Sequence, residues 1–330
     1  MKTGLRWQQQ NSFGTAVTNS LDAGAIAQQT LTDHLEIMAR PSFLKRLATS
    51  PFRRLAQEAR GGITCEMRPF EFQEFTRAAL GYQTAVASSN GINTYTTHPT
   101  SVDLYLRSAL APFTFQFLTD AGAIWQVQDL VCSRWELETR AKGLAQLNTQ
   151  WIGSVSSWTT TVSFAPVTSG VFLSDQSSVS WAGAGDPDFE SVRIAVDNHM
   201  QIVRTLSGTQ GPYAIKRDAP RSVTVEADVI FSTTSRWAEF LASSESQLIV
   251  TLPTSGSLDA SVTVRNLRIM NYQVQPGTGV LKARFLAQAQ PDTNGRELQT
   301  TLKTPTTHFF STFLLDDTIF GRLDRANILA

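Results

Sequence analysis

Two stretches of the sequence, about half a chain apart, share one pattern of residue types, and this repeat limits the folds that the chain can adopt. Residues 61–72 read GGITCEMRPFEF, and residues 221–231 read RSVTVEADVIF. In both stretches apolar residues alternate with Thr and Glu, the pattern of a strand with one buried face. Because one match can arise by chance, the neighbouring segments decide whether the chain is duplicated.

Each copy of this strand is followed by a short predicted helix. The first helix spans residues 69–80 and ends at Gly81, a residue that often stops helices. The second follows the N-cap candidates at 233–235. In both helices two aromatic residues lie three positions apart, on one helical face, where we expect them to plug the core of a sheet. These four plugs are Phe72, Phe75, Trp237 and Phe240.

Two further blocks repeat in the same order. Residues 128–137 align with 265–274, and residues 35–38 align with 192–195. Four ordered blocks indicate an internal duplication, and 330 residues suffice for two domains. The predicted class is mostly β (α+β), with two tandem β-sandwich or barrel domains and one short flanking helix in each. The expected domains are 1–160 with an insert at 82–110, then 161–298, followed by a C-terminal extension at 299–330.

The composition bears on the class of partner. Lys+Arg and Asp+Glu both total 28, so the formal net charge is zero. Such a balance argues against a nucleic-acid binder that relies on a basic surface. Only 17% of residues are charged, against about 25% in an average domain. We therefore expect copies of the chain to cover much of its surface.

The sequence carries no recognisable catalytic motif. Its four histidines are scattered, and its acidic pairs are more readily explained as solvated or capping carboxylates than as a cation site. We predict no enzymatic activity, no metal and no cofactor. Cys65 falls opposite Val225 in the repeat and is expected to be a small buried residue, with a disulfide as the less favoured alternative. We expect neither a signal peptide nor a membrane span.

One charge pattern stands out from this background. The segments after the first strand of each copy, 40–60 and 204–221, are basic, whereas acidic residues collect elsewhere. These segments are either solvated loops or one half of a complementary contact between copies. The basic residues are Arg40, Lys45, Arg46, Arg53, Arg54, Arg60, Lys216, Arg217 and Arg221. The acidic counterparts are Asp186, Asp188, Glu190, Asp316, Asp317 and Asp324.

Three motifs, taken in order, resemble one family. They are the opening QNSFGTAV at 10–17, the strand SVTVEA that leads into a helix, and VRNLRI at 264–269 followed by PGTGVL at 276–281. Together they resemble the major tail tube proteins of long-tailed bacteriophages, in the tandem version with two tube domains in one chain. The resemblance covers roughly residues 10–290, and it does not extend to the insert at 82–110 or to the C-terminal extension.

The resemblance implies a structural virion protein that assembles with itself. In this family inner sheets join edge to edge around a channel, which leaves no sheet edge exposed. A tandem chain then implies trimeric, pseudo-sixfold rings stacked into a tube that delivers DNA to the host cell. The implied partners are other copies of the chain and the tape-measure, distal-tail and tail-terminator proteins, with DNA only in transit. The protein would be made in the host cytoplasm and reside in the phage tail.

Two roles follow for particular residues. The long loops after the first strands, which hold the basic residues above, would reach the adjacent ring. The polar face of the repeated strand would line the channel, through Thr64, Glu66, Thr224, Glu226 and Asp228. The alternatives are a ring that does not polymerise, such as a distal-tail or baseplate-hub protein, and a contractile-secretion-type tube. A carbohydrate-active or receptor-binding β-protein is a third class, which would require exposed aromatic residues and paired carboxylates on one face.

Overall fold

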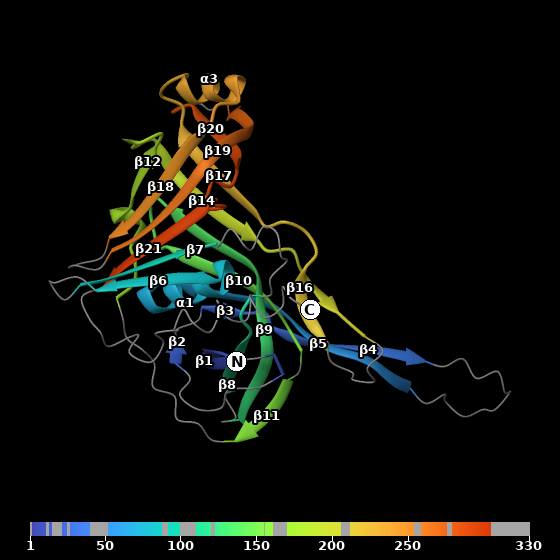
Figure 1. Cartoon of the computed structure of the whole chain (residues 1–330). Coiled ribbons are helices and arrows are strands. Elements are labelled where there is room, and N and C mark those ends of the chain that lie inside the picture. The colour runs from blue at the N-terminus through green and yellow to red at the C-terminus, as the bar shows by residue number, and fades with distance from the viewer. Residues whose placement is uncertain are drawn as a thin grey trace.

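The computed structural model describes residues 2–10, 13–14, 22–24, 27–39, 52–87, 92–99, 110–119, 123–154, 156–160, 170–205, 212–253, 259–275 and 279–304. Within these residues the chain is mostly β, with two α-helices, and every strand pairing is antiparallel (Figure 1). The elements of the first half are β1 (Lys2–Gln9), β2 (Asp22–Gly24), β3 (Gln28–Gln29), β4 (Thr32–Ala39), β5 (Phe52–Glu66), α1 (Pro69–Leu80), β6 (Tyr82–Ala87), β7 (Asn93–His98), β8 (Phe113–Thr119), β9 (Ala123–Arg140), β10 (Gln146–Gly153) and β11 (Ser156–Thr160). Those of the second half are η1 (Ser174–Gln176), β12 (Ser178–Trp181), β13 (Ala184–Gly185), β14 (Phe189–Asp197), β15 (Met200–Val203), β16 (Ala214–Arg217), β17 (Ser222–Ile230), α3 (Ser235–Ala242), β18 (Ser246–Pro253), β19 (Asp259–Gln275), β20 (Lys282–Ala289) and β21 (Leu298–Thr304).

One sheet runs through both halves of the chain, and we call it the long sheet. Its strand order is β5, β10, β9, β14, β17, β20, β19, and β3 and β4 pair with the other side of β5. The two halves meet where the second part of β9 pairs with β14, from Arg140 opposite Ser191 to Arg134 opposite Asp197. The long sheet is therefore continuous across the midpoint of the chain.

Two further sheets cover the long sheet. The first cover sheet consists of β2, β1, β8, the first part of β9 and β11. The second consists of β13, β12, β18, the first part of β19, β21, β7 and β6. The hairpin β6–β7 belongs to the predicted insert, yet it pairs with β21 of the second half, from Thr97 opposite Thr300 to Asn93 opposite Thr304. The insert thus ties the halves together a second time.

Strands β9 and β19 each pass from a cover sheet into the long sheet. At the crossing β9 has Asp129 at φ 59° and β19 has Asn266 at φ 48°. Both angles lie in the left-handed region, which Asp and Asn tolerate better than other residues with a side chain. Just beyond each crossing the ladder to the next strand shifts register, between Gln150 and Trp151 of β10 and between Ile269 and Asn271 of β19. Both strands therefore bend at a left-handed residue that is followed by a register shift.

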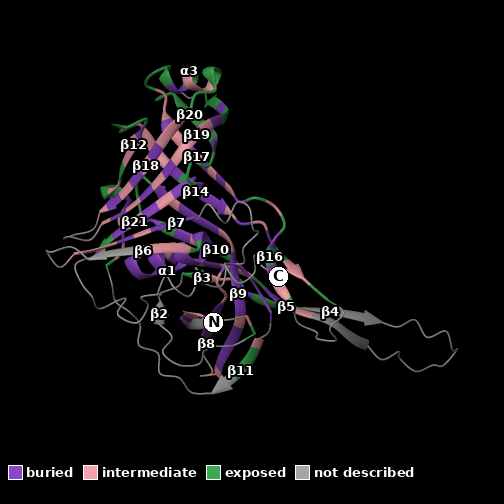
Figure 2. Cartoon of the chain, in the orientation of Figure 1, coloured by how far each residue is buried: buried purple, intermediate pink, exposed green. Residues whose placement is uncertain are grey.

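One large buried cluster fills the space between the sheets, and a smaller one includes Met200 of β15 and Ile215 of β16. In β17 and β20 every second residue is buried, as in Val223, Val225 and Ala227, while the residues between them face outward. Aromatic rings dominate the part of the core in the first half, where Trp151 lies 4.6 Å from Phe115 between ring centroids. Figure 2 shows the buried residues along the strands of both halves and the exposed surface of α3 at one end.

Several features predicted from the sequence are confirmed, and several are corrected. Helix α1 spans the predicted residues and ends at Gly81, which has φ 91°. Both cysteines are buried and free. Residues 52–60 are not loop: they form the first part of β5, which pairs with β4 in a hairpin that projects from the sheets (Figure 1). Their charges obscured the strand, because the segment FRRLAQEAR lacks the alternation of apolar and polar residues that indicates a strand.

The remaining corrections concern domain boundaries and closure. The stretch from 299, expected to be an extension, begins within β21 and pairs with β19. Segment 204–221 contains β16, which pairs with β15. Strands of the described residues do not close into a barrel, so the barrel alternative is wrong for the single chain. The aligned block at 35–38 lies in the projecting part of β4, opposite Arg53–Gln57, and not beside the segment of β5 that matches β17.

Candidate functional site on the polar face of the long sheet

The polar face of the long sheet carries a group of charged side chains from four adjacent strands. Strand alternation places these side chains opposite the core, because Trp135 and Leu137 of β9 and Val192 and Ile194 of β14 are buried. The charged residues of this face are Arg134, Glu136, Glu138 and Arg140 on β9, Arg193 on β14, Glu226 and Asp228 on β17, and Lys282 and Arg284 on β20.

Ion pairs link neighbouring strands across this face. Arg193 lies 2.8 Å from Glu136 on β9 and 3.8 Å from Glu226 on β17. Arg284 reaches Glu226 at 3.8 Å and Asp228 at 2.7 Å. Opposite charges on adjacent strands stabilise a sheet by about 0.2–1 kcal/mol per pair. The pairs thus form a ladder that crosses the boundary between the two halves of the chain.

The ladder also shifts the pKa of its members. The hydrogen bond from Arg284 lowers the pKa of Asp228, helped by a second bond from Ser191. The same interaction raises the pKa of Arg284, and the hydrogen bond to Glu136 raises the pKa of Arg193. Each shift favours the charged form. Asp228, Arg284 and Arg193 are therefore held in their charged forms.

The ladder borders an open groove of about 590 Å³. Its lining includes cations from β9, β14 and β20 and carboxylates from β9 and β17. Charges of both signs alternate over short distances, so the groove has no large field of one sign. Such a surface repels neither a polyanion nor a polycation strongly and binds neither strongly.

All five residues predicted to line a channel lie on this polar face. Thr64, Thr224, Glu226 and Asp228 are partly exposed on strands whose alternate residues are buried. Glu66, at the end of β5, lies 3.4 Å from Arg68 and its side chain is 42% exposed. Burial of Glu66 and Glu226 in the core would have contradicted the predicted orientation, and neither residue is in the core.

The predicted basic residues are found in different environments. Arg60 is exposed and pairs with Glu58 at 2.5 Å, and Lys216 is exposed on β16. Arg217 and Arg221 are buried in the single chain, which argues against a direct contact of either side chain with another ring. Arg217 donates to Asn198 Oδ1 at 3.0 Å. Arg40, Lys45 and Arg46 lie outside the described residues, as do the side chains of Arg53 and Arg54.

The buried arginines have a tertiary cause. Arg221 lies 3.7 Å from the buried carboxylate of Glu297, a residue far away in the sequence. Asn198 holds Arg217 and also donates to the backbone oxygens of Ala79 and Cys132. Ion pairing and hydrogen bonding compensate part of the cost of burying a guanidinium group.

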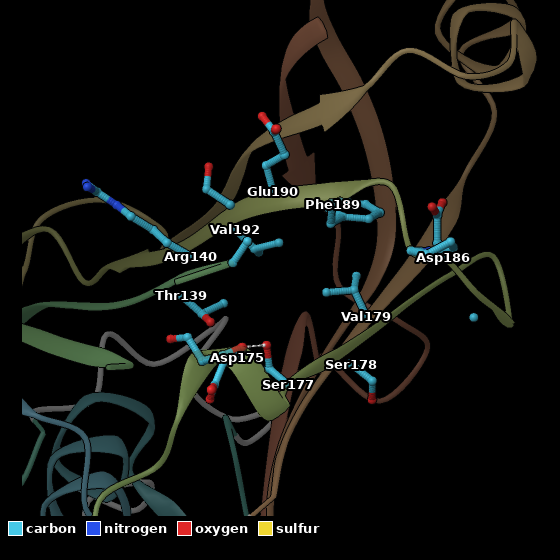
Figure 3. Close-up of a pocket in the computed structure, with 15 residues that line it drawn as sticks. Thr139, Arg140, Asp175, Ser177, Ser178, Val179, Asp186, Phe189, Glu190 and Val192 are labelled. Atoms are coloured by element: carbon cyan, nitrogen blue, oxygen red, sulfur yellow. Dashed lines mark hydrogen bonds between the residues drawn. The ribbon is translucent and has the colours of Figure 1, made fainter. Parts of the chain in front are cut away.

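Two of the predicted acidic residues, Asp186 and Glu190, line one cleft. This cleft of about 460 Å³ is lined by the end of β9 and by β14, and it includes Asp186 and Glu190 (Figure 3). Asp186 and Asp188 both pair with the buried Arg236 of α3. Glu190 lies 2.7 Å from Lys282. These carboxylates already have partners in their own chain; Asp316, Asp317 and Asp324 lie outside the described residues.

The four aromatic plugs differ between the two helices. Phe72 and Phe75 of α1 are fully buried, and Phe75 lies 5.7 Å from Trp151 between ring centroids. On α3, Phe240 is partly buried against the core, but Trp237 is 38% exposed. Trp237 packs on Tyr272 of β19 with a centroid distance of 5.7 Å. In the single chain Trp237 therefore lies at the edge of the core.

One buried network was missed by sequence reasoning. Asp129 accepts hydrogen bonds from Gln10 Nε2 at 3.1 Å, from the backbone N–H of Gly14 at 2.6 Å and from Ser154 Oγ. The Gln10 Oε1 accepts from the Asp129 backbone N–H at 2.7 Å. The network anchors the QNSFG motif to the point where β9 changes sheets. The motif was visible in the sequence, but its partner is more than a hundred residues away.

The described residues show no group of three or more His, Cys, Asp or Glu arranged to hold a metal ion. Where the structure describes the chain, no helix is long and apolar enough to cross a membrane. His98 is buried, and burial lowers its pKa. Its Nδ1 lies 2.8 Å from the backbone oxygen of Pro99, so this histidine has a structural partner.

Comparison with known proteins identifies the family. None of the curated proteins compared with the chain matches it. The sequence model of the family described as phage tail tube protein matches residues 2–297, which is most of the chain. That span includes the long sheet, both helices and the polar face. The chain belongs to the phage tail tube protein family, and it is a component of the tail of a phage virion.

Proposed function

We propose that the chain is a non-catalytic structural subunit that forms trimeric, pseudo-sixfold rings, which stack into the tail tube and enclose a channel for DNA. The observation that carries the proposal is the long sheet. It joins two similar halves edge to edge within one chain, through β9 and β14. A ring repeats this junction between chains, and it pairs the two outer edges of the long sheet.

The repeated pairing pattern supports an internal duplication. The order β3/β4, β5, β10, β9 in the first half corresponds to β14, β17, β20, β19 in the second half. The left-handed residues Asp129 and Asn266 and the adjacent register shifts fall at the same places in this order. We propose a first domain at 1–160 and a second domain that begins at 161 and extends past 298 to the end of β21, with the insert 82–110 supplying β6 and β7.

The two outer edges of the long sheet are complementary. In the described residues the second part of β19 pairs only with β20, and β3 and β4 pair only with β5. By correspondence with Leu137 opposite Ile194 at the internal junction, Val274 would lie opposite Leu31 of the next chain. Gln273 would then lie opposite Thr32. Val274 is 40% exposed in the single chain, consistent with a residue that is covered on ring closure.

The polar face would line the channel in such a ring. Its paired charges leave a surface on which DNA can move without being held, because binding of DNA to protein depends mainly on unpaired cations near the phosphates. The predicted lining residues Thr64, Glu66, Thr224, Glu226 and Asp228 would then contact the channel. Glu136 and Arg193, missed by sequence reasoning, would lie among them.

The proposed polarity of stacking follows from the two rims of the long sheet. The hairpins β4–β5 and β15–β16 both extend from the same rim of the long sheet, the one that holds Arg60 and Asp197. The acidic cleft with Asp186 and Glu190 lies at the opposite rim, next to Arg140. Basic hairpins of one ring would meet the acidic rim of the next ring. The tape-measure, distal-tail and tail-terminator proteins are the proposed further partners.

Electron microscopy of the purified protein in negative stain, at low and high salt, tests this proposal. We expect tubes of stacked threefold rings, which are shorter at high salt if charged hairpins contribute to stacking. Isolated rings at every salt concentration, even with a nucleating partner, would favour a distal-tail or hub ring. A chain that stays monomeric at every concentration would refute ring formation.

A matched pair of substitutions tests the edge contact. Val274→Lys places a charge in the proposed junction, on its core side, and should prevent ring closure. Val280→Lys makes the same change at a residue that is 60% exposed near the β19–β20 turn, and should leave rings intact. Equal behaviour of the two variants would show that β19 is not the joining edge.

A further inference from the structure

The two helices of the chain have opposite environments. Every residue of α1 is buried, and the helix packs against β9, β7 and β21. Helix α3 packs against β19, and its outer face is open (Figures 1 and 2). Trp237, at the edge of the contact with β19, is 38% exposed, and Leu241 is 66% exposed. These residues lie four positions apart and therefore share one side of the helix.

A second exposed aromatic residue lies at the opposite end of the molecule from α3 (Figure 1). Trp158 is on β11, the edge strand of the first cover sheet, and it is 66% exposed. It lies directly opposite Trp125 of β9, which is 4% exposed and belongs to the core. Residues directly opposite on antiparallel strands point to the same side of a sheet. Trp158 therefore faces the core side of the cover sheet but lies beyond the part that the chain covers.

The internal contact between the two halves shows what occupies this position. Strand β11 pairs with the first part of β9, and β21 pairs with the first part of β19 in the same place. The core side of β21 is buried through Leu298, Thr300 and Leu302. Helix α1 of the first half contacts β21 of the second half. Within one chain, the helix of one half thus reaches the cover sheet of the next half.

We infer that the same contact forms between chains: the Trp237–Leu241 face of α3 docks on Trp158 of the next copy of this chain. The inference rests on the proposed ring, in which β19 joins β3 and β4 of a neighbour. That junction brings α3 to the neighbour's β11 as the internal junction brings α1 to β21. The partner is a second copy, because the chain supplies both apolar surfaces and the internal contact shows their arrangement.

The contact between chains differs from the internal one in a single respect. Helix α1 is followed by the hairpin β6–β7, which adds strands to the edge of β21. Helix α3 is followed directly by β18, so no such hairpin extends from the second half. Within the chain, both α1 and the hairpin β6–β7 contact β21. At the junction between chains there is no such hairpin, so the side chains of α3 must supply the whole contact with β11. Trp237, Leu241 and Trp158 are therefore the expected anchors.

Truncation of these anchors provides the first test. Leu241→Ala and Trp158→Ala change exposed side chains and should leave the fold of the monomer intact. We expect each to raise the protein concentration needed for ring assembly by on the order of 10- to 100-fold, the range for anchor residues in interfaces. The matched control is Leu286→Ala, on the polar face and 43% exposed, which should change this concentration less than about twofold.

Cross-linking provides a second test with a different readout. A chain carrying both Leu241→Cys and Trp158→Cys, treated with a short bismaleimide after assembly, should yield covalent dimers and trimers. Each single variant should stay monomeric in a denaturing gel, because the two native cysteines are buried. Leu286→Cys combined with Leu241→Cys is the matched control and should give no cross-link.

The outcomes separate this inference from the proposed ring. Rings that assemble normally from both alanine variants and that give no cross-link in the double-cysteine variant would overturn the helix contact and leave the ring in place. Failure of the unmodified chain to form rings under any condition would remove both. Rings with a cross-link that reaches the trimer would support both.

Discussion

Substitution of Asp129 should destabilise the chain far more than substitution of Asn266, although both residues mark the crossing of a strand between sheets. Both have left-handed φ angles, 59° and 48°. Only Asp129 is fully buried, and it accepts three hydrogen bonds, from Gln10, Gly14 and Ser154. The Asn266 side chain donates one long bond, 3.5 Å to the Pro291 oxygen.

Glycine substitutions separate the two contributions. Glycine adopts the left-handed region without strain, so Asp129→Gly and Asn266→Gly remove the side-chain bonds and keep the backbone angle. Loss of Asp129 leaves two buried donors, on Gln10 and Ser154, without an acceptor at about 1–3 kcal/mol each, and it also removes the part-buried bond from the Gly14 N–H. We expect a loss of roughly 3–6 kcal/mol for Asp129→Gly and less than about 1 kcal/mol for Asn266→Gly. Asp129→Asn keeps one acceptor oxygen and should cost about 1–3 kcal/mol.

Urea unfolding followed by tryptophan fluorescence measures these differences. The protein concentration must be low enough for the unmodified chain to be monomeric, which sedimentation velocity verifies, because assembly adds stability of its own. Equal midpoints and slopes for the two glycine variants would refute the argument. They would show that the Gln10–Asp129–Ser154 network contributes no more than a single exposed hydrogen bond.

Three further predictions concern charge, thiol reactivity and backbone packing. Arg284 lowers the pKa of Asp228 below its usual value of 3.8, so their interaction should stabilise the fold above pH 3.8, and this stabilisation should be lost as the pH falls through the lowered pKa. Asp228→Asn should remove this contribution to the loss of stability in acid. Burial raises the pKa of the Cys65 thiol well above its usual value, so a maleimide should label this thiol only at the rate of unfolding, and rapid labelling of the native chain would contradict its burial. A Cβ at Gly61 would lie 2.4 Å from backbone atoms of Thr30 and Leu31, so Gly61→Ala should lower the free energy of unfolding by about 1–3 kcal/mol. Gly185→Ala, with open space around it, should change stability little in the same unfolding assay.

Strand orientation was predictable from the sequence, but the level of each strand in the sheet was not. Alternation with period two correctly placed Thr64 and Glu66 on the polar face. The sequence repeat, however, aligned Cys65 with Val225. In the structure Cys65 lies opposite Leu147, which pairs with Leu137 of β9, and Val229 lies opposite Ala283, which pairs with Val274 of β19. Because Leu137 corresponds to Val274, Cys65 corresponds to Val229. The shift is an even number of residues, so it preserves the face of each side chain.

The sequence by itself determined the features that depend on local pattern: the mostly β class, helix α1 and the repeated blocks at 128–137 and 265–274, which lie in β9 and β19. Only the tertiary structure decided which charges are exposed. Arg217 and Arg221 read as solvated cations, yet Asn198 and Glu297 hold them in the interior. These partners come from distant segments that only the folded sheets bring together. Local patterns report which face of a strand is apolar, whereas pairing partners and burial depend on contacts that no short window contains.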